Sequence, residues 1–308
     1  MQTDQIMSAI FLVAVLTLIL PSFLSKNNKL KEFLKYRKDF SLGFLTTESF
    51  HPLSKNLSNE VNTDIKKAIQ TLKVPVDTII SAGYIEKTNN VVTGLFVDNA
   101  MSLILNKIPK SDEILKKKAI LKAQGDCLAF GLTTIDIAGL NKEDIDLLEK
   151  LHSTNELKIK VYAMILNNEE NFKFYIDSLG HPYKTKKLNV RSFKFFADGS
   201  LGSRGACLLK PYEDQENSYG MLLQKKELFE KKLRKIKLAG FQACTHSIGD
   251  STNRSVLKSY SKILKSSNDL RWRIEHAQCI NNNDLHYFKD FNIIPSVQPT
   301  HATSDYSW

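Results

Sequence analysis

His246 and His276 are the residues whose types and spacing best suit metal chemistry. Each ends a short β-like run, FQACTH and RWRIEH, and 30 residues separate them. One strand–helix unit of a (β/α)8 barrel takes about 31 residues, so consecutive strands would present both histidines at the same mouth. Either histidine alone would more often be structural. Together they predict a pair of imidazole ligands for a divalent ion, with zinc the expected metal.

Lys194 is the third candidate ligand. It lies in RSFKFFADGS, where an extended strand would place it on one face with Phe196 and Asp198. Inside a barrel its ammonium group would lose hydration, which lowers the lysine pKa and favours the neutral amine. A neutral amine can take up carbon dioxide and become a carbamate, an oxygen ligand for metal. A salt bridge from Lys194 to Asp198 is the alternative. Without evidence from other residues, this salt bridge is the favoured interpretation of Lys194.

Arg204 and His301 are candidate substrate-binding residues. Arg204 follows several glycines and serines and could hold a carbonyl or carboxylate group, whereas His301, in QPTHATSD, could contact substrate or donate a proton. The alternatives are a solvated loop arginine and a surface histidine. Arg204 belongs to a Gly-rich, polar segment over residues 198–220, where a lid over the substrate would be expected.

Short β-like runs alternate with helical stretches beyond residue 130, and these elements must position the candidate residues. The runs cover residues 133–137, 158–165, 191–197, 241–246, 271–276 and 292–298. Between them, Asn141 can cap a helix over 141–151, and Gly240 follows a Lys-rich helical stretch that carries Phe229, Leu233 and Ile236. This alternation predicts an α/β fold with a parallel sheet and crossover helices.

The composition is that of an ordinary folded protein. The chain has 308 residues, of which 42% are hydrophobic and 25% charged, which excludes a disordered polymer and a multi-span membrane protein. Its four cysteines form no CxxC pair, so reduced thiols and a cytoplasmic location are expected. The net charge of +10 is spread along helix-like stretches, so no nucleic-acid partner is predicted.

Residues 6–24 form an uncharged apolar segment of 19 residues, close to the length that crosses a bilayer. Basic residues follow this segment, and Asp4 is the only charged side chain before it. This asymmetry is typical of a signal anchor that leaves the rest of the chain in the cytosol. The alternative is a buried core helix, or an apolar stretch that belongs to no element of the native fold. The predicted organisation is an apolar segment over 1–25, a mixed β appendage over 26–110 and a barrel-like domain over 111–308.

Four blocks, KFFADGSLGSRGACLLKPYED, QACTHSIGDSTNR, RWRIEHAQ and SVQPTHATSD, resemble consecutive motifs of the amidohydrolase superfamily. They are most similar to its YtcJ-like branch, amidohydrolase family 3, and the resemblance extends over roughly residues 80–308. It implies a (β/α)8 barrel with one or two divalent metals, and a hydrolase that uses metal-activated water on carbon–nitrogen bonds of small amide-like, non-peptide substrates. It also implies that Lys194 is the carbamylated lysine and that His246 and His276 are metal ligands.

Two departures from the family pattern shape the remaining predictions. The sequence has no His-x-His pair for strand one, and it ends before the Asp of strand eight. We therefore expect a partial TIM barrel with strands 2 to 7 present and strands 1 and 8 missing. Its general base is unknown, and we expect the chain to be truncated and, as a hydrolase, weak or inactive alone. A non-catalytic, membrane-tethered amidohydrolase-like binding protein is the alternative, and a homo-oligomer is left open.

Overall fold

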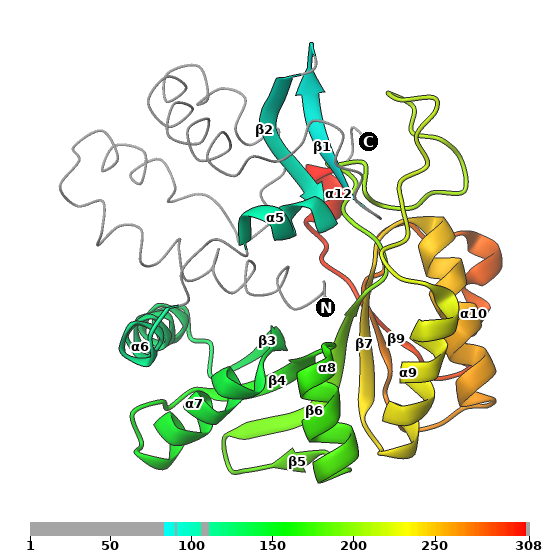
Figure 1. Cartoon of the computed structure of the whole chain (residues 1–308). Helices are drawn as coiled ribbons and strands as arrows, with labels where there is room; N and C mark the ends of the chain where they lie inside the picture. The colour runs from blue at the N-terminus through cyan, green and yellow to red at the C-terminus, as the bar shows by residue number, and fades with distance from the viewer. Residues whose placement is uncertain (1–82, 90, 106–110, 306–308) are drawn as a thin grey trace. The chain divides into compact units, whose positions relative to one another are not determined.

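The computed structural model describes residues 83–89, 91–105 and 111–305 (Figure 1). The apolar segment 6–24, and with it the predicted anchor, lies outside these residues. Within the described ranges, no helix is both long enough and apolar enough to cross a bilayer. The predicted boundaries at residues 25 and 110 stay predictions.

The chain divides into two compact units, each assembled from separate stretches. Among the described residues, the first unit contains 105, 111–195 and 235–244, and the second contains 83–89, 91–104, 196–234 and 245–305. Lys194 therefore belongs to the first unit, whereas His246, His276, Arg204 and His301 belong to the second.

The main sheet has the strand order β3-β4-β6-β7-β8-β9, with the short β5 paired antiparallel to β6. Its strands are β3 (Thr134–Leu140), β4 (Lys160–Leu166), β5 (Tyr183–Lys184), β6 (Leu188–Phe196), β7 (Gln242–Ser247), β8 (Arg273–His276) and β9 (Ile294–Ser296). The pairs β3–β4, β4–β6 and β8–β9 are parallel. Each of the predicted β-like runs overlaps one of these strands, so the predicted α/β fold is confirmed, and it is consistent with part of a TIM barrel.

Helices alternate with these strands along the chain, as the predicted pattern requires. They are α6 (Glu113–Ala129), α7 (Lys142–Ser153), α8 (Glu169–Phe172) with its π-helical continuation Lys173–Leu179, α9 (Lys226–Leu238), α10 (Asp250–Leu264), α11 (His286–Asp290) and α12 (His301–Ser304). α7 begins after Asn141 as expected, but the predicted side-chain cap is wrong: the Asn141 amide oxygen instead accepts a hydrogen bond from Asn168. Gly240 has φ +76°, a conformation that glycine adopts without strain.

The first unit has an aromatic core beneath β6. Phe193 packs against Phe172, Tyr175 and Phe241, with ring centroids 4.8, 6.5 and 5.2 Å apart. Successive side chains of a strand point to opposite faces, so Lys194 lies on the face of β6 opposite this aromatic cluster. Lys194 is buried, with 3% of its surface exposed.

The second unit contains the antiparallel hairpin of β1 (Gly83–Thr88) and β2 (Val91–Asp98), where the sequence predicts a β segment. The short helix α5 (Ser102–Leu105) follows this hairpin. On β7, the Thr245 hydroxyl lies 2.7 Å from the Tyr260 hydroxyl of α10. The neighbouring His246 consequently points to the face of β7 away from α10.

Candidate metal site

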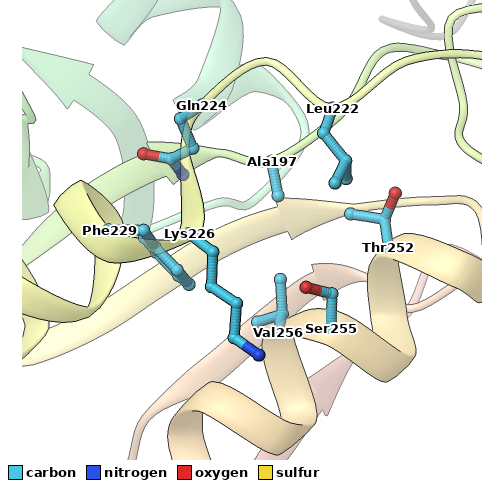
Figure 2. Close-up of a pocket in the computed structure, with 8 residues that line it drawn as sticks. All are labelled: Ala197, Leu222, Gln224, Lys226, Phe229, Thr252, Ser255 and Val256. Atoms are coloured by element: carbon cyan, nitrogen blue, oxygen red, sulfur yellow. The ribbon is translucent and has the colours of Figure 1, made fainter.

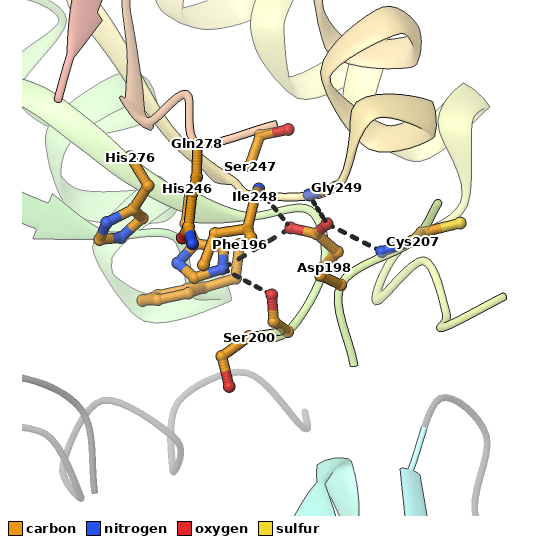
Figure 3. Close-up of polar contacts among 12 residues, drawn as sticks. Phe196, Asp198, Ser200, Cys207, His246, Ser247, Ile248, Gly249, His276 and Gln278 are labelled. Carbon is orange, nitrogen blue, oxygen red and sulfur yellow. Dashed lines mark hydrogen bonds and ion pairs between the residues drawn. The ribbon is translucent and has the colours of Figure 1, made fainter. Parts of the chain in front are cut away.

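Three imidazole rings, from β7, β8 and α12, contact one another in sequence in the second unit, with His276 between His246 and His301. The rings of His246 and His276 are 4.6 Å apart between centroids and inclined at 69°. The ring of His301 stacks on His276 at 5.8 Å. The structure thus brings together two of the predicted ligands and one of the predicted substrate-binding residues. Figure 3 shows the His246 and His276 rings side by side.

His246 is almost fully buried, and its surroundings fix which nitrogen carries the proton. Its Nε2 lies 3.2 Å from the carbonyl oxygen of Gly199. A carbonyl oxygen only accepts hydrogen bonds, so Nε2–H donates and the lone pair of the neutral ring is at Nδ1. The ring of Phe196 lies 5.6 Å from that of His246, between centroids. His246 can therefore offer a metal its Nδ1 in a setting shielded from water.

His276 occupies an unusual stretch of backbone at the end of β8. Both His276 (φ +76°) and Ala277 (φ +45°) adopt the left-handed region, which costs L residues roughly 1–2 kcal/mol each. Such strain persists only where the surroundings enforce it, and it is common at functional sites. The Nδ1 atom of His276 lies 2.7 Å from Oε1 of Gln298.

Asp198 is a buried carboxylate next to His246. From the sequence, only a salt bridge with Lys194 is expected of it. Its oxygens accept hydrogen bonds from the backbone N–H groups of Cys207, Ile248 and Gly249, at 3.0, 3.0 and 2.9 Å. Burial raises the pKa of Asp198 to about 7, while these backbone donors act in the opposite direction. The sequence signal that could have identified it is an acidic residue directly after a strand, in ADGS.

The first part of the expected lid over residues 198–220 is held by hydrogen bonds and apolar packing. Tyr212 donates a hydrogen bond from its hydroxyl to the carbonyl of Ala206, and Leu209 donates its backbone N–H to Asp250, both at 2.8 Å. Leu201, Ala206 and Tyr212 pack with Ile248 into one buried cluster. Residues 213–217 are exposed. The segment is therefore a packed loop with a solvent-exposed tip.

Arg204 has an acidic partner within its own loop. The guanidinium group of Arg204 makes a two-pronged ion pair with the half-exposed carboxylate of Asp214, with Nε 3.2 Å from Oδ1. The structure thus gives Arg204 a protein partner, and its contact with substrate stays a prediction. Lys194 belongs to the first unit, and its role as a metal ligand also stays a prediction.

In the part of the chain that the structure describes, no three His, Cys, Asp or Glu side chains are grouped so as to hold a metal ion.

A small cavity elsewhere in the second unit, between the start of α9 and α10, is lined by Phe229, Thr252 and Val256 among others (Figure 2). Its volume of about 20 Å³ admits roughly one water molecule.

Residues 71–308 match the family model described as "Amidohydrolase family". Among curated proteins, the chain is 26% identical over 234 residues to the putative amidohydrolase YtcJ of Bacillus subtilis (strain 168), covering 73% of this chain and 42% of that protein. It is 28% identical over 230 residues to Protein LONG AFTER FAR-RED 3 of Arabidopsis thaliana, covering 69% and 39%. The chain therefore spans about two fifths of the length of these relatives.

Two solved structures share the fold. They are described as uncharacterized metal-dependent hydrolases from Pyrococcus horikoshii OT3 and Pyrococcus furiosus, with TM-scores of 0.60 and 0.61 and identities of 24% and 23%. The similarity covers 72% of this chain and 45% of the first structure, and 78% and 48% for the second.

Proposed function

Because this chain belongs to the amidohydrolase family, we propose that it forms the divalent-metal site of a hydrolase acting on carbon–nitrogen bonds of small amide-like substrates other than peptides. The observation that carries the proposal is the pairing of His246 and His276, whose ring centroids are 4.6 Å apart. His246 and His276 are the proposed imidazole ligands. Lys194, buried in β6, is the proposed oxygen ligand as its carbamate.

The chemistry of the donors fits such an ion. Zinc binds imidazole nitrogens at about 2.0–2.1 Å, and the adjacent rings of His246 and His276 are close enough for both to reach one ion. A neutral histidine ligates through one nitrogen while the other donates a hydrogen bond, as His246 does to Gly199. When bound, a divalent metal lowers the pKa of water and polarises a substrate carbonyl.

The chain's own residues would orient the ligands and move a proton. Gly199 holds His246 through its carbonyl oxygen, and Phe196 covers one side of that ring. His301, stacked on His276, is the proposed residue for substrate contact or proton transfer. Hydrolysis of an amide needs a proton delivered to the leaving nitrogen, and a protonated imidazole can supply it as a general acid.

Metal analysis of the purified full-length chain tests the proposal. We expect close to one equivalent of zinc per chain, lost in a His246→Ala/His276→Ala double variant. His286→Ala is the matched control, because His286 is exposed and its Nδ1 lies 2.9 Å from the Asn283 carbonyl. Absence of zinc from the wild-type chain would contradict the metal site.

A panel of small amides then separates catalysis from binding. Zinc-dependent hydrolysis of any member supports the hydrolase. Stoichiometric zinc with saturable binding of amides but no turnover would instead support the non-catalytic binding protein.

A further inference from the structure

We propose that Gln298 and Gln278 are positioning residues that set the tautomers of His276 and His301. Each glutamine contacts Nδ1 of one histidine through its side-chain oxygen, and each is itself held by a second hydrogen bond from its amide nitrogen. The assignment of tautomers is independent of any metal. Its consequence for metal affinity rests on the proposed function.

The orientation of the Gln298 amide follows from its two contacts. Nε2 of Gln298 donates to the backbone carbonyl of Ser296 at 3.2 Å, which places Oε1 2.7 Å from Nδ1 of His276. The reversed amide would bring two oxygen acceptors together at the Ser296 carbonyl, an arrangement without a hydrogen bond. Because Oε1 can only accept, Nδ1 of His276 carries the proton and the lone pair of the neutral ring is at Nε2.

Gln278 makes the same arrangement for His301. Its Nε2 donates to the Asp305 carboxylate at 2.7 Å, and its Oε1 accepts from Nδ1 of His301. Here the reversed amide would place its oxygen against a carboxylate, which is more unfavourable still. Nδ1 of His301 also lies 3.6 Å from the Asp305 carboxylate, which further favours a proton at that nitrogen. His301 thus also has its lone pair at Nε2.

The two glutamines differ in what they should affect. Gln298 holds a proposed metal ligand, so loss of its oxygen removes the acceptor that favours a proton at Nδ1 of His276. Outer partners of this kind typically contribute 10–100-fold to metal affinity. Gln278 holds His301, which is a proposed substrate or proton-transfer residue, so its loss should leave zinc affinity nearly unchanged. Substitution of Gln298 therefore tests the effect on His276 and zinc affinity, and the same substitution of Gln278 is the matched control.

The test uses the full-length chain and has two readouts. Long-range ¹H–¹⁵N correlation spectra of the zinc-free, ¹⁵N-histidine-labelled protein report each tautomer, with His276 assigned by comparison with His276→Gln. Competition with a chromophoric chelator reports zinc affinity. The variants are Gln298→Met, which removes the acceptor at similar size, Gln298→Glu, which keeps an acceptor oxygen, and Gln278→Met. Urea unfolding midpoints establish that each variant is folded.

We expect His276 to be the Nδ1–H tautomer in the wild-type protein and a mixture in Gln298→Met, with zinc bound 10–100-fold more weakly. Gln298→Glu, which keeps the acceptor oxygen but loses the bond to the Ser296 carbonyl, should keep the Nδ1–H tautomer. Gln278→Met should change the zinc dissociation constant less than about 3-fold. An Nε2–H tautomer of His276 in the wild-type protein overturns the inference, as does a Gln298→Met variant with unchanged tautomer and affinity. If the wild-type chain binds no zinc but the tautomers behave as expected, the positioning role stands and the proposed metal site fails.

Discussion

The Asp198 carboxylate lies 3.6 Å, Oδ1 to Nε2, from His246. Figure 3 shows this carboxylate between the His246 ring and the backbone N–H groups of Cys207, Ile248 and Gly249. Gly249 precedes the first turn of α10, so the positive end of that helix also faces Asp198. One side chain thus connects the loop over 198–220, the start of α10 and a proposed ligand.

Replacing Asp198 should cost substantial stability. Asp198→Ala leaves three backbone N–H groups without their acceptor, and each unsatisfied buried donor costs about 1–3 kcal/mol. We expect the free energy of unfolding in urea to fall by roughly 3 kcal/mol or more. Asp214→Ala is the control in the same loop. It removes a half-exposed ion pair with Arg204 and should cost less than about 1 kcal/mol. Equal losses in the two variants would refute the structural role of Asp198.

Gly249 should tolerate no side chain. A Cβ built there would lie 2.0 Å from the carbonyl oxygen of Cys207 and 2.6 Å from its nitrogen, both backbone atoms that cannot move independently. Gly249→Ala should therefore lower the free energy of unfolding by about 3 kcal/mol. Gly125→Ala provides the opposite case, because nothing lies within 4 Å of its Cβ position in α6. Thermal or urea unfolding should show a gain of about 0.5–1 kcal/mol for Gly125→Ala, and a loss there would contradict this account.

Asp98 predicts a pH dependence of stability. Burial raises its pKa from 3.8 to about 6, and its Oδ2 has no hydrogen-bond partner among the described residues. Between these two values the folded state binds more protons than the unfolded state, so this contribution to stability is present at low pH and is lost as the pH rises through about 6. Asp98→Asn, which cannot ionise, should be about 1–2 kcal/mol more stable than the wild-type chain at pH 8 and equal to it near pH 4.

Urea unfolding of both proteins at pH 4, 6 and 8 measures this difference. Asp126→Asn is the control, because Asp126 is an exposed partner of Lys122 and should shift stability by less than about 0.5 kcal/mol at each pH. An Asp98→Asn variant whose advantage does not grow between pH 4 and pH 8 would show that Asp98 does not have the raised pKa.

The sequence predicts the elements well because their signals are local. Alternating β-like and helical runs locate β3, β4 and β6 to β9 but not the short β5, and apolar residues at helical spacing, Phe229, Leu233 and Ile236, are the buried face of α9. The adjacency of His246 and His276 follows from repeat spacing alone. The contacts of Gln298 and Gln278 with the histidines could not be predicted, because they join residues 22 and 23 positions apart that only the fold brings close. Asp198 stands directly after a predicted β-like run, but its backbone N–H partners, 9 to 51 residues away, also depend on the fold.

The end of α10 offers a test of backbone strain by one substitution at two positions. Lys265 follows the helix with φ +72° and an exposed side chain, a conformation that favours glycine. Lys265→Gly should therefore raise the free energy of unfolding by about 0.5–1 kcal/mol. Lys258 is equally exposed but lies within α10, where glycine costs about 1 kcal/mol. Opposite signs for the two variants in urea unfolding are expected, and a destabilised Lys265→Gly would show that the Lys265 backbone is not strained in the folded protein.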